Sequence, residues 1–197
     1  MSIATSSVSR MTLDVSLVLP AYNEATRLGD AVLQSQSYLV SRRYSYEIII
    51  AEDGSTDGTD KIAAEVAGKH TTVRHIHGRR RLGKGAALTI AFKQARGSIV
   101  CYTDVDLATP VTYLGALIES IRGGYDIATG SRMLRQSRAR RGSLRKMMSS
   151  IYNLLVRCLL RSGIHDHQCG FKGFSRHALG LLLDEVESNN WFWDTEM

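Results

Sequence analysis

Membrane-spanning segments, secretion signals and internal repeats are all missing from this chain of 197 residues. No run of residues reaches the ~18–20 apolar side chains that a helix needs to cross a bilayer. Residues 1–10 are polar and rich in Ser and Thr, without the apolar centre of a secretory signal. We therefore expect a disordered start over residues 1–12, followed by a domain that does not cross a membrane.

Cysteine and proline are also scarce. The chain has two prolines and three cysteines, and Cys101, Cys158 and Cys169 lack the paired spacing of a metal site. Their odd number and their positions in apolar runs indicate reduced thiols. This pattern predicts a cytoplasmic protein.

Acidic residues are absent between Asp126 and Asp166, although the whole chain carries a formal charge of +6. A block of one charge favours an anionic partner, which can be a phosphate, a lipid head group or a nucleic acid. The interval holds nine basic residues, which are Arg132, Arg135, Arg138, Arg140, Arg141, Arg145, Lys146, Arg157 and Arg161.

Apolar runs alternate with helical patterns along the first two thirds of the chain. Residues 15–19, 48–51 and 98–102 are typical of buried parallel strands, and residues 73–76 and 127–129 predict weaker strands. Apolar residues at helical spacing follow each of the first four runs. The pattern predicts a Rossmann-like α/β domain, with a mostly parallel central sheet and helices on both faces. In such folds ligands bind at the carboxyl edge of the sheet.

Two carboxylates end the central strand of this predicted sheet. Asp104 and Asp106 follow the apolar run over residues 98–102 and are separated by one residue. A divalent cation, Mg²⁺ or Mn²⁺, would offset their repulsion and could also bind phosphate oxygens. The alternative is a solvated Asp-x-Asp turn, since the triplet by itself is common.

Other strand ends carry residues suited to a nucleotide. Tyr22 lies in the strand-to-helix turn at residues 20–24, where it is either a stacking partner for a base or a half-buried loop residue. Asp53 ends the second strand, where it either accepts hydrogen bonds from a ligand or belongs to a capping turn. Gly83 and Lys84 precede a helix, an arrangement that suits phosphate, although a basic run is often only a solvated face. Neither a Walker motif nor a G-x-G-x-x-G after the first strand is present, which argues against a dinucleotide dehydrogenase.

The last third of the chain is less regular. Residues 144–160 predict a helix that is apolar over more than half of its surface, so it is either buried or in a lipid interface. Ser175 is a candidate cap for a short helix. Asp194 lies among three aromatic residues at positions 191–193, and such surroundings can raise the pKa of a carboxyl group.

Several of these stretches together resemble the family 2 glycosyltransferases of the GT-A fold. The later stretches, at residues 130–132, 166–172 and 191–196, look like the dolichyl-phosphate β-glucosyltransferase branch, with the dolichyl-phosphate mannose synthases next. The first four matching motifs span residues 14–132 in the family's order and spacing. They are Val18-Leu19-Pro20-Ala21-Tyr22-Asn23-Glu24, Asp53-Gly54-Ser55-Thr56-Asp57-Gly58-Thr59, Gly83-Lys84-Gly85 and Asp104-Val105-Asp106.

The resemblance implies a role for each matching residue. The nucleotide sugar would be bound by Pro20, Tyr22, Glu24, Asp53, Ser55, Gly83 and Lys84, with Asp53 at the base and Lys84 near the diphosphate. Asp104 would face the ribose and the metal, and Asp106 would be the main metal ligand. Arg132 and Lys172 would meet a phosphate of the donor or the acceptor. Asp194 would be a catalytic base only if the acceptor were a hydroxyl group.

Two departures from the family pattern stand out. Mannose synthases place a Gln two residues after the second aspartate as a further metal ligand, whereas Ala108 occupies that position here. The sequence also stops at Met197, where the family usually continues. We therefore expect residues 13–197 to form a single GT-A domain that is truncated at its C-terminus.

The resemblance implies an inverting transfer of glucose from UDP-glucose to dolichyl or another polyprenyl phosphate, at the cytoplasmic face of a membrane. One alternative is a mannose synthase that uses GDP-mannose. A sugar-phosphate nucleotidyltransferase would need a Gly-rich motif after the first strand, which residues 20–24 do not supply. The remaining alternative is a non-enzymatic module that binds anionic lipid or RNA. We expect no nucleic-acid partner, because no strand interleaves aromatic and basic residues.

Overall fold

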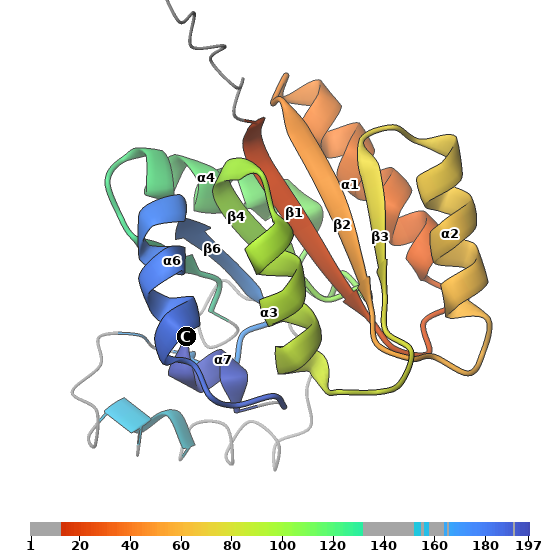
Figure 1. The fold of residues 1–197 in the computed structure, drawn as a ribbon. Helices are drawn as coiled ribbons and strands as arrows, with labels where there is room; N and C mark the ends of the chain where they lie inside the picture. Colours follow the sequence, from red (N-terminus) through yellow and green to blue (C-terminus); the bar gives the residue numbers. More distant parts are fainter. Residues whose placement is uncertain (1–12, 132–151, 155, 158–163, 165, 191) are drawn as a thin grey trace, which may run out of the picture.

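The computed structural model describes residues 13–131, 152–154, 156–157, 164, 166–190 and 192–197. In this part of the chain six strands form one sheet in the order β3-β2-β1-β4-β6-β5 (Figure 1). The first four run parallel to one another, whereas β6 is antiparallel to both β4 and β5. Their bounds are β1 Leu13–Ala21, β2 Tyr46–Glu52, β3 Val73–His77, β4 Gly97–Thr103, β5 Ile127–Thr129 and β6 Phe171–Ser175.

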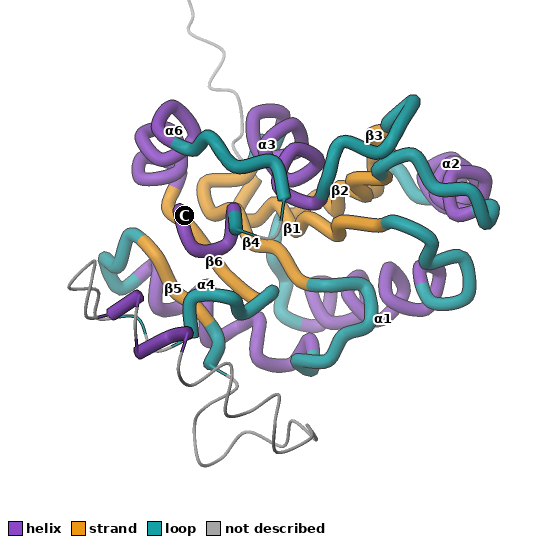
Figure 2. Tube along the Cα trace, turned by 90° about the horizontal axis from the view of Figure 1, so that it is seen from below, coloured by secondary structure: helices purple, strands orange, loops and turns teal. Residues whose placement is uncertain are grey.

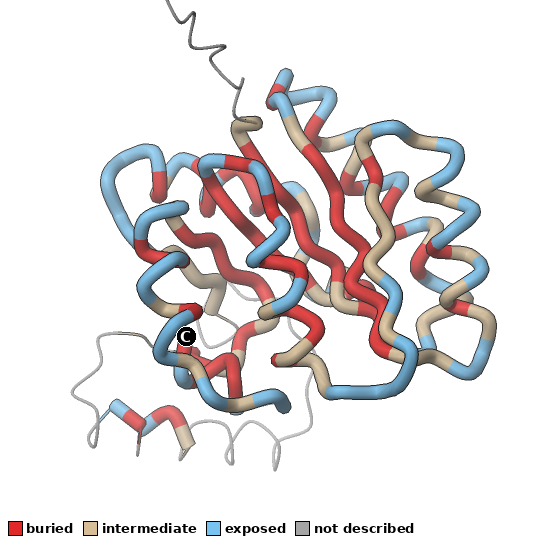
Figure 3. The backbone as a smooth tube through the Cα atoms, in the orientation of Figure 1, coloured by how far each residue is buried: buried red, intermediate tan, exposed pale blue. Residues whose placement is uncertain are grey.

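The central strands are buried on both faces, as their unbroken apolar runs predict. In β1, Leu17 and Leu19 join one apolar cluster, whereas Val18 between them joins the cluster on the opposite face. Successive side chains of a strand point to opposite faces, so a strand covered on both sides needs apolar residues at every position. Figure 3 shows the buried residues running along the strands and the exposed residues on the outer sides of the helices.

Helices cover both faces of the sheet, and Figure 2 shows α3 and α6 on the side opposite to α1 and α4. The first cluster joins the sheet to α1, α2 and α4, and the second joins it to α3, α6 and α7. The prediction of a mostly parallel sheet with helices on both faces is confirmed. The helices are α1 Leu28–Ser41, α2 Thr59–Lys69, α3 Lys84–Gln94, the 3-10 turn η1 Val111–Tyr113, α4 Leu114–Arg122, α6 Arg176–Glu185 and α7 Trp193–Glu196.

Strand β6 is the feature that the sequence patterns do not predict. It lies between β4 and β5, and Lys172 pairs with Tyr102 on one side and with Thr129 on the other. A lysine and a glycine interrupt its apolar residues, so neither the alternating nor the continuous strand pattern appears. The helix that follows does begin as predicted, because the Ser175 hydroxyl accepts a hydrogen bond from the Ala178 amide at 3.1 Å.

Some predictions fall on residues outside the described part of the chain. They include the disordered start over residues 1–12, every basic residue of the acid-free interval except Arg157, and most of the helix predicted over residues 144–160. Residues 152–154 and 156–157 of that helix are described, and they are helical. No helix among the described residues combines the length and the apolar character needed to cross a membrane.

Candidate active site

A pocket of about 250 Å³ opens at the carboxyl edge of the sheet, where the parallel strands β1, β2 and β4 end. This is the edge at which open α/β sheets bind ligands. Seven of the predicted site residues meet in its lining. They are Pro20, Tyr22, Glu24, Asp53, Lys84, Asp104 and Asp106.

Two loops from neighbouring strands form the wall around Tyr22. The guanidinium carbon of Arg81 lies 4.0 Å from the centre of the Tyr22 ring, a cation–π contact. Next to Tyr22, the Asn23 amide donates to the Ser55 hydroxyl at 3.0 Å, and the Thr56 amide donates to the Asn23 side chain at 2.9 Å. These bonds join the end of β1 to the end of β2. Ser55 therefore supports the wall from the loop and is not one of the lining residues.

Asp53 holds the loop that leads into α3. Its carboxylate accepts hydrogen bonds from the Leu82 amide at 2.7 Å and from the Gly83 amide at 2.8 Å. Gly83 has a φ of 107°, a backbone conformation that favours glycine. Asp53 is 5% exposed, at the pocket wall. A carboxylate has about four acceptor positions, so these two bonds leave capacity for a ligand.

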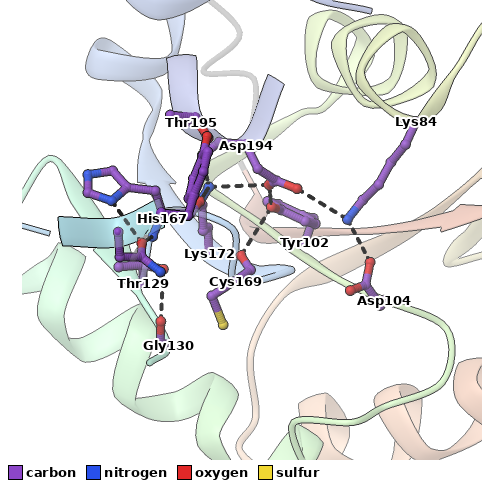
Figure 4. Close-up of polar contacts among 12 residues, drawn as sticks. Lys84, Tyr102, Asp104, Thr129, Gly130, His167, Cys169, Lys172, Asp194 and Thr195 are labelled. Carbon is purple, nitrogen blue, oxygen red and sulfur yellow. Dashed lines mark hydrogen bonds and ion pairs between the residues drawn. The ribbon is translucent and has the colours of Figure 1, made fainter. Parts of the chain in front are cut away.

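Lys84 stands between two carboxylates, as Figure 4 shows. Its ammonium nitrogen lies 2.8 Å from Asp104 Oδ1 and 3.4 Å from Asp194 Oδ2. Burial by itself lowers the pKa of Lys84, but the charges of Asp194 and Asp104 outweigh burial and raise the pKa. Lys84 therefore stays charged at neutral pH at the first position of α3, so a fixed positive charge and a helix N-terminus face the pocket together.

Asp194 belongs to a buried polar network beneath the pocket (Figure 4). It bonds to the hydroxyl of Tyr102 and accepts from the ammonium of Lys172 at 3.2 Å, besides its contact with Lys84. Burial raises the pKa of Asp194 to about 6, although Lys84 opposes this shift. The raised pKa expected from the aromatic surroundings is present, and Trp193 is itself almost fully buried.

Lys172 lies in the core and not in the lining of the pocket. It is 2% exposed, and its ammonium donates to the carbonyl oxygens of His167 and Asp194 as well as to the Asp194 carboxylate. A buried ammonium is costly unless its protons are satisfied, and here three acceptors surround it. Lys172 thus holds Asp194 in position through the core, a different place from the phosphate contact that the resemblance implies. Arg132, the other predicted phosphate contact, lies outside the described residues.

Asp104 and Asp106 supply oxygen ligands on the open side of the pocket. The Asp104 side chain is 46% exposed, and Asp106 is exposed, with one oxygen accepting from the Ala108 amide at 3.0 Å. Hard oxygen donors of this kind suit Mg²⁺ or Mn²⁺, so the two residues fit the cation that the sequence predicted. Ala108 contributes its backbone amide to Asp106 and has no side-chain ligand to offer.

The sequence patterns do not predict the role of two residues of the site. Arg81 is the last of three consecutive arginines, a pattern typical of a solvated face, and its contact with Tyr22 depends on the fold. Tyr102 is fully buried in β4 and touches Asp194, which is 92 residues away in the sequence. The one available signal is a phenol inside an apolar strand, two residues before Asp104, because a buried tyrosine hydroxyl usually has a hydrogen-bond partner.

Comparison with known proteins places this fold and pocket in a family. The model for "Glycosyl transferase family 2" matches residues 16–182. Glycosyltransferase AglD of Haloferax volcanii is 48% identical over 94% of this chain, and the dolichyl-phosphate beta-glucosyltransferase of Homo sapiens is 32% identical over 94% of it. The chain spans 30% of the length of the first of these relatives and 62% of the second.

Solved structures agree with the fold. A glucosyl-3-phosphoglycerate synthase from Mycobacterium tuberculosis, solved in complex with Mn²⁺, UDP and glucosyl-3-phosphoglycerate, has a TM-score of 0.69 and 24% identity to this chain. The match covers 93% of this chain and 63% of that structure, which is a GT-A glycosyltransferase. From the family match and the identity to these relatives, the chain belongs to glycosyl transferase family 2.

Proposed function

We propose that this chain catalyses the inverting transfer of glucose from UDP-glucose to dolichyl phosphate or another polyprenyl phosphate. One observation carries the proposal: the ammonium of Lys84, fixed between Asp104 and Asp194, faces the pocket that Tyr22 and Asp53 also line. The names of the relatives, which include dolichyl-phosphate beta-glucosyltransferases and an undecaprenyl-phosphate sugar transferase, support the acceptor class.

The donor would lie along the pocket from Tyr22 to Asp106. The ring of Tyr22, backed by Arg81, offers a stacking surface for the base, and Asp53 offers acceptor positions for its N–H groups. Lys84 would meet the diphosphate, whose negative charge increases as the bond to the sugar breaks. A cation that is already in place stabilises this charge without reorganisation during the reaction.

Asp104 and Asp106 would hold Mg²⁺ or Mn²⁺ at the same end of the pocket. When bound, the ion would neutralise charge on the leaving diphosphate. The ammonium of Lys84 occupies part of the coordination capacity of Asp104. Asp106, which has no basic partner among the described residues, is the more available ligand.

The chemistry of the acceptor decides whether the enzyme needs a base. A phosphate monoester has a second pKa of about 6, so its oxygen is largely ionised at neutral pH. That oxygen would attack the anomeric carbon on the face opposite to UDP. The bond to UDP would break, UDP would leave with the electron pair, and the configuration would invert. Asp194 is buried and bonded to Tyr102, Lys172 and Lys84, which suits a positioning role better than proton transfer.

Product analysis tests this function directly. The chain is incubated with Mn²⁺, dolichyl phosphate and radiolabelled UDP-glucose or GDP-mannose, and label that enters the organic phase is measured. We expect lipid-linked glucose from the wild type and a loss of at least about tenfold in Asp106→Ala, because even loss of a group that only supports a metal ligand costs about 10–100-fold. Transfer from GDP-mannose alone would identify a mannose synthase, and absence of any lipid-linked sugar would refute the proposal.

Contact with a membrane surface is part of the proposal, because the acceptor is a lipid. The acid-free interval between Asp126 and Asp166 supplies the positive charge, and each Lys or Arg near an anionic surface contributes about 1 kcal/mol. We expect the chain to sediment with anionic liposomes at low salt but not with neutral ones. Replacing Arg138, Arg140 and Arg141 with Ser should reduce this binding, whereas the same change at Lys61, Lys69 and Lys93 should not.

The liposome assay can also refute the surface contact. If the wild type does not sediment with anionic liposomes even at low salt, the basic interval does not bind membranes. An equal loss in the two sets of variants would mean that net charge alone governs the binding. We further propose that the surface is the cytoplasmic face, because the odd number of cysteines and their positions in apolar runs indicate reduced thiols.

A further inference from the structure

A second group of possible metal ligands lies outside the pocket, where β2 and β3 end side by side. Glu52 is the last residue of β2 and pairs in register with His77, the last residue of β3. His75 lies two residues before His77, so both imidazoles belong to the same face of the strand. Ile50, two residues before Glu52, packs in the cluster of α1 and α2, which identifies that face. None of the three side chains lines the pocket.

The ligating atoms of these side chains are already close together. One carboxylate oxygen of Glu52 and one ring nitrogen of each histidine all lie within 4.8 Å of one another. Glu52 Oε2 and His77 Nδ1 are 2.6 Å apart. The Glu52 side chain is 0% exposed and that of His77 is 50% exposed, so the group is anchored in the protein and open to solvent on one side.

His75 adds a separate observation. Its Nε2 atom is shielded from solvent and has no hydrogen-bond partner in the part of the chain that the structure describes. A buried polar atom without a partner is unusual in a folded protein, and the binding of a metal ion is one of its standard explanations. The imidazole therefore has unused capacity next to a fully buried carboxylate.

We propose that Glu52, His75 and His77 form a binding site for a transition-metal ion of the zinc type, distinct from the Asp104 and Asp106 site. Two imidazoles and one carboxylate are an established ligand set for Zn²⁺, with the fourth position left to water. Imidazole nitrogen favours Zn²⁺, Co²⁺ or Ni²⁺, whereas Mn²⁺ binds most weakly in the divalent series. The two sites of this chain thus select different ions by ligand chemistry.

The ion would connect two neighbouring loops that contribute residues to the pocket. Besides its contact with His77, Glu52 accepts from the Ser55 amide at 2.5 Å, and its carbonyl accepts from the Gly78 amide at 2.8 Å. The loop after β2 carries Asp53, and the loop after β3 leads to Lys84. A metal shared by the two strand ends would therefore stabilise both loops without touching the donor.

Cobalt provides the test, because the colour of Co²⁺ reports its coordination. The metal-free chain is titrated with Co²⁺ and followed by visible absorption. We expect one equivalent to bind with the intense bands of four- or five-coordinate Co²⁺, which Zn²⁺ abolishes and Mn²⁺ leaves in place. His77→Gln should weaken Co²⁺ binding by at least about tenfold. Zn²⁺ should raise the melting temperature of the wild type and not that of His77→Gln.

Matched variants separate this site from its alternatives. His70→Gln changes another histidine beside the same strand and should leave the cobalt spectrum and the affinity unchanged. Asp106→Ala should also leave them unchanged, which excludes binding in the pocket. His77 is half exposed, so its replacement is compatible with folding, and circular dichroism verifies this. Absence of the cobalt bands, or bands of the same intensity and affinity in His77→Gln, would overturn the proposal and leave Glu52 and His77 as a hydrogen-bonded pair.

Discussion

Replacing Lys84 with Met removes the positive charge from the pocket and keeps most of the side-chain volume. The ammonium lies 2.8 Å from Asp104 Oδ1 and 3.4 Å from Asp194 Oδ2, so the change affects both carboxylates. Asp104 is half exposed and stays hydrated without its partner. Asp194 is buried but keeps its contacts with Tyr102 and Lys172. We therefore expect Lys84→Met to fold.

The effect on donor binding follows from the lost contact with the diphosphate. A hydrogen bond to a charged group contributes about 1.5–3 kcal/mol, which corresponds to roughly 10–150-fold in affinity. The affinity for UDP should fall by this amount, whereas uridine, which has no phosphate, should bind to the variant as it does to the wild type. The pKa of Asp194 should rise above its value of about 6, because Lys84 is the group that lowers it.

Isothermal titration with uridine and UDP, with and without Mn²⁺, measures these effects. Lys93→Met is the matched control, since Lys93 lies exposed on the same helix α3. Binding of Mn²⁺ in the absence of nucleotide should become stronger in Lys84→Met, because the Asp104 carboxylate is no longer neutralised. This result would show that Mn²⁺ and the Lys84 ammonium compete for the Asp104 carboxylate in the wild type.

Two results would refute this reasoning. If UDP bound equally well to Lys84→Met and to the wild type, Lys84 would not contact the diphosphate. If uridine were weakened as much as UDP, Lys84 would maintain the shape of the pocket and its charge would have no direct role. Either result would remove the observation on which the proposed function rests.

Three further predictions concern the surroundings of Lys84. Asp53→Ala should weaken uridine and UDP alike, by about 1.5–3 kcal/mol in titrations, because Asp53 holds the Leu82 and Gly83 amides beside the base; a loss confined to UDP would contradict this role. Gly85→Ala should lower the free energy of unfolding by about 1–3 kcal/mol in urea, because its new methyl group would meet the Trp193 side chain at 2.7 Å. Gly68→Ala in α2, with nothing within 4 Å, is its control and should be neutral or stabilising. The raised pKa of Asp194 adds stability that is complete below pH ~4 and is lost as the pH rises through about 6. The free energy of unfolding of Asp194→Asn should therefore gain about 3 kcal/mol relative to that of the wild type between pH 4 and 8. A parallel pH dependence of unfolding in the two proteins would show that Asp194 does not titrate in this range.

The pocket at the strand ends could be predicted from the sequence because each part of it is local. Apolar runs predict β1, β2 and β4, and the residues that follow each run must then meet at one edge of a parallel sheet. Tyr22, Asp53 and Asp104 are placed by this argument alone, and they line the same pocket. Whether they bind the donor stays a prediction.

The buried network around Asp194 could not be predicted in this way, because it depends on contacts between residues far apart in the chain. Lys172 and Gly173 interrupt the apolar residues of strand β6, so its pattern is not recognised, and its place between β4 and β5 is set by pairing. The sequence therefore gives no sign that Lys172 lies beside Tyr102, or that both touch Asp194. Without that pairing, a lysine after a polar loop is more readily assigned to a phosphate than to the core.

The position of β6, antiparallel to β4, also explains how the C-terminal segment is held beside the pocket. Pairing with Tyr102 buries the Lys172 ammonium, which is strongly unfavourable until acceptors surround it. The carbonyl and carboxylate of Asp194 provide two of those acceptors, so α7 is held where Lys172 is satisfied. The remaining oxygen of Asp194 then faces Lys84 across the pocket floor. The buried charge of Lys172 in β6 thus fixes Asp194, and Asp194 in turn fixes the direction of the Lys84 ammonium at the start of α3. These contacts connect β6 and α7 to the pocket through the core.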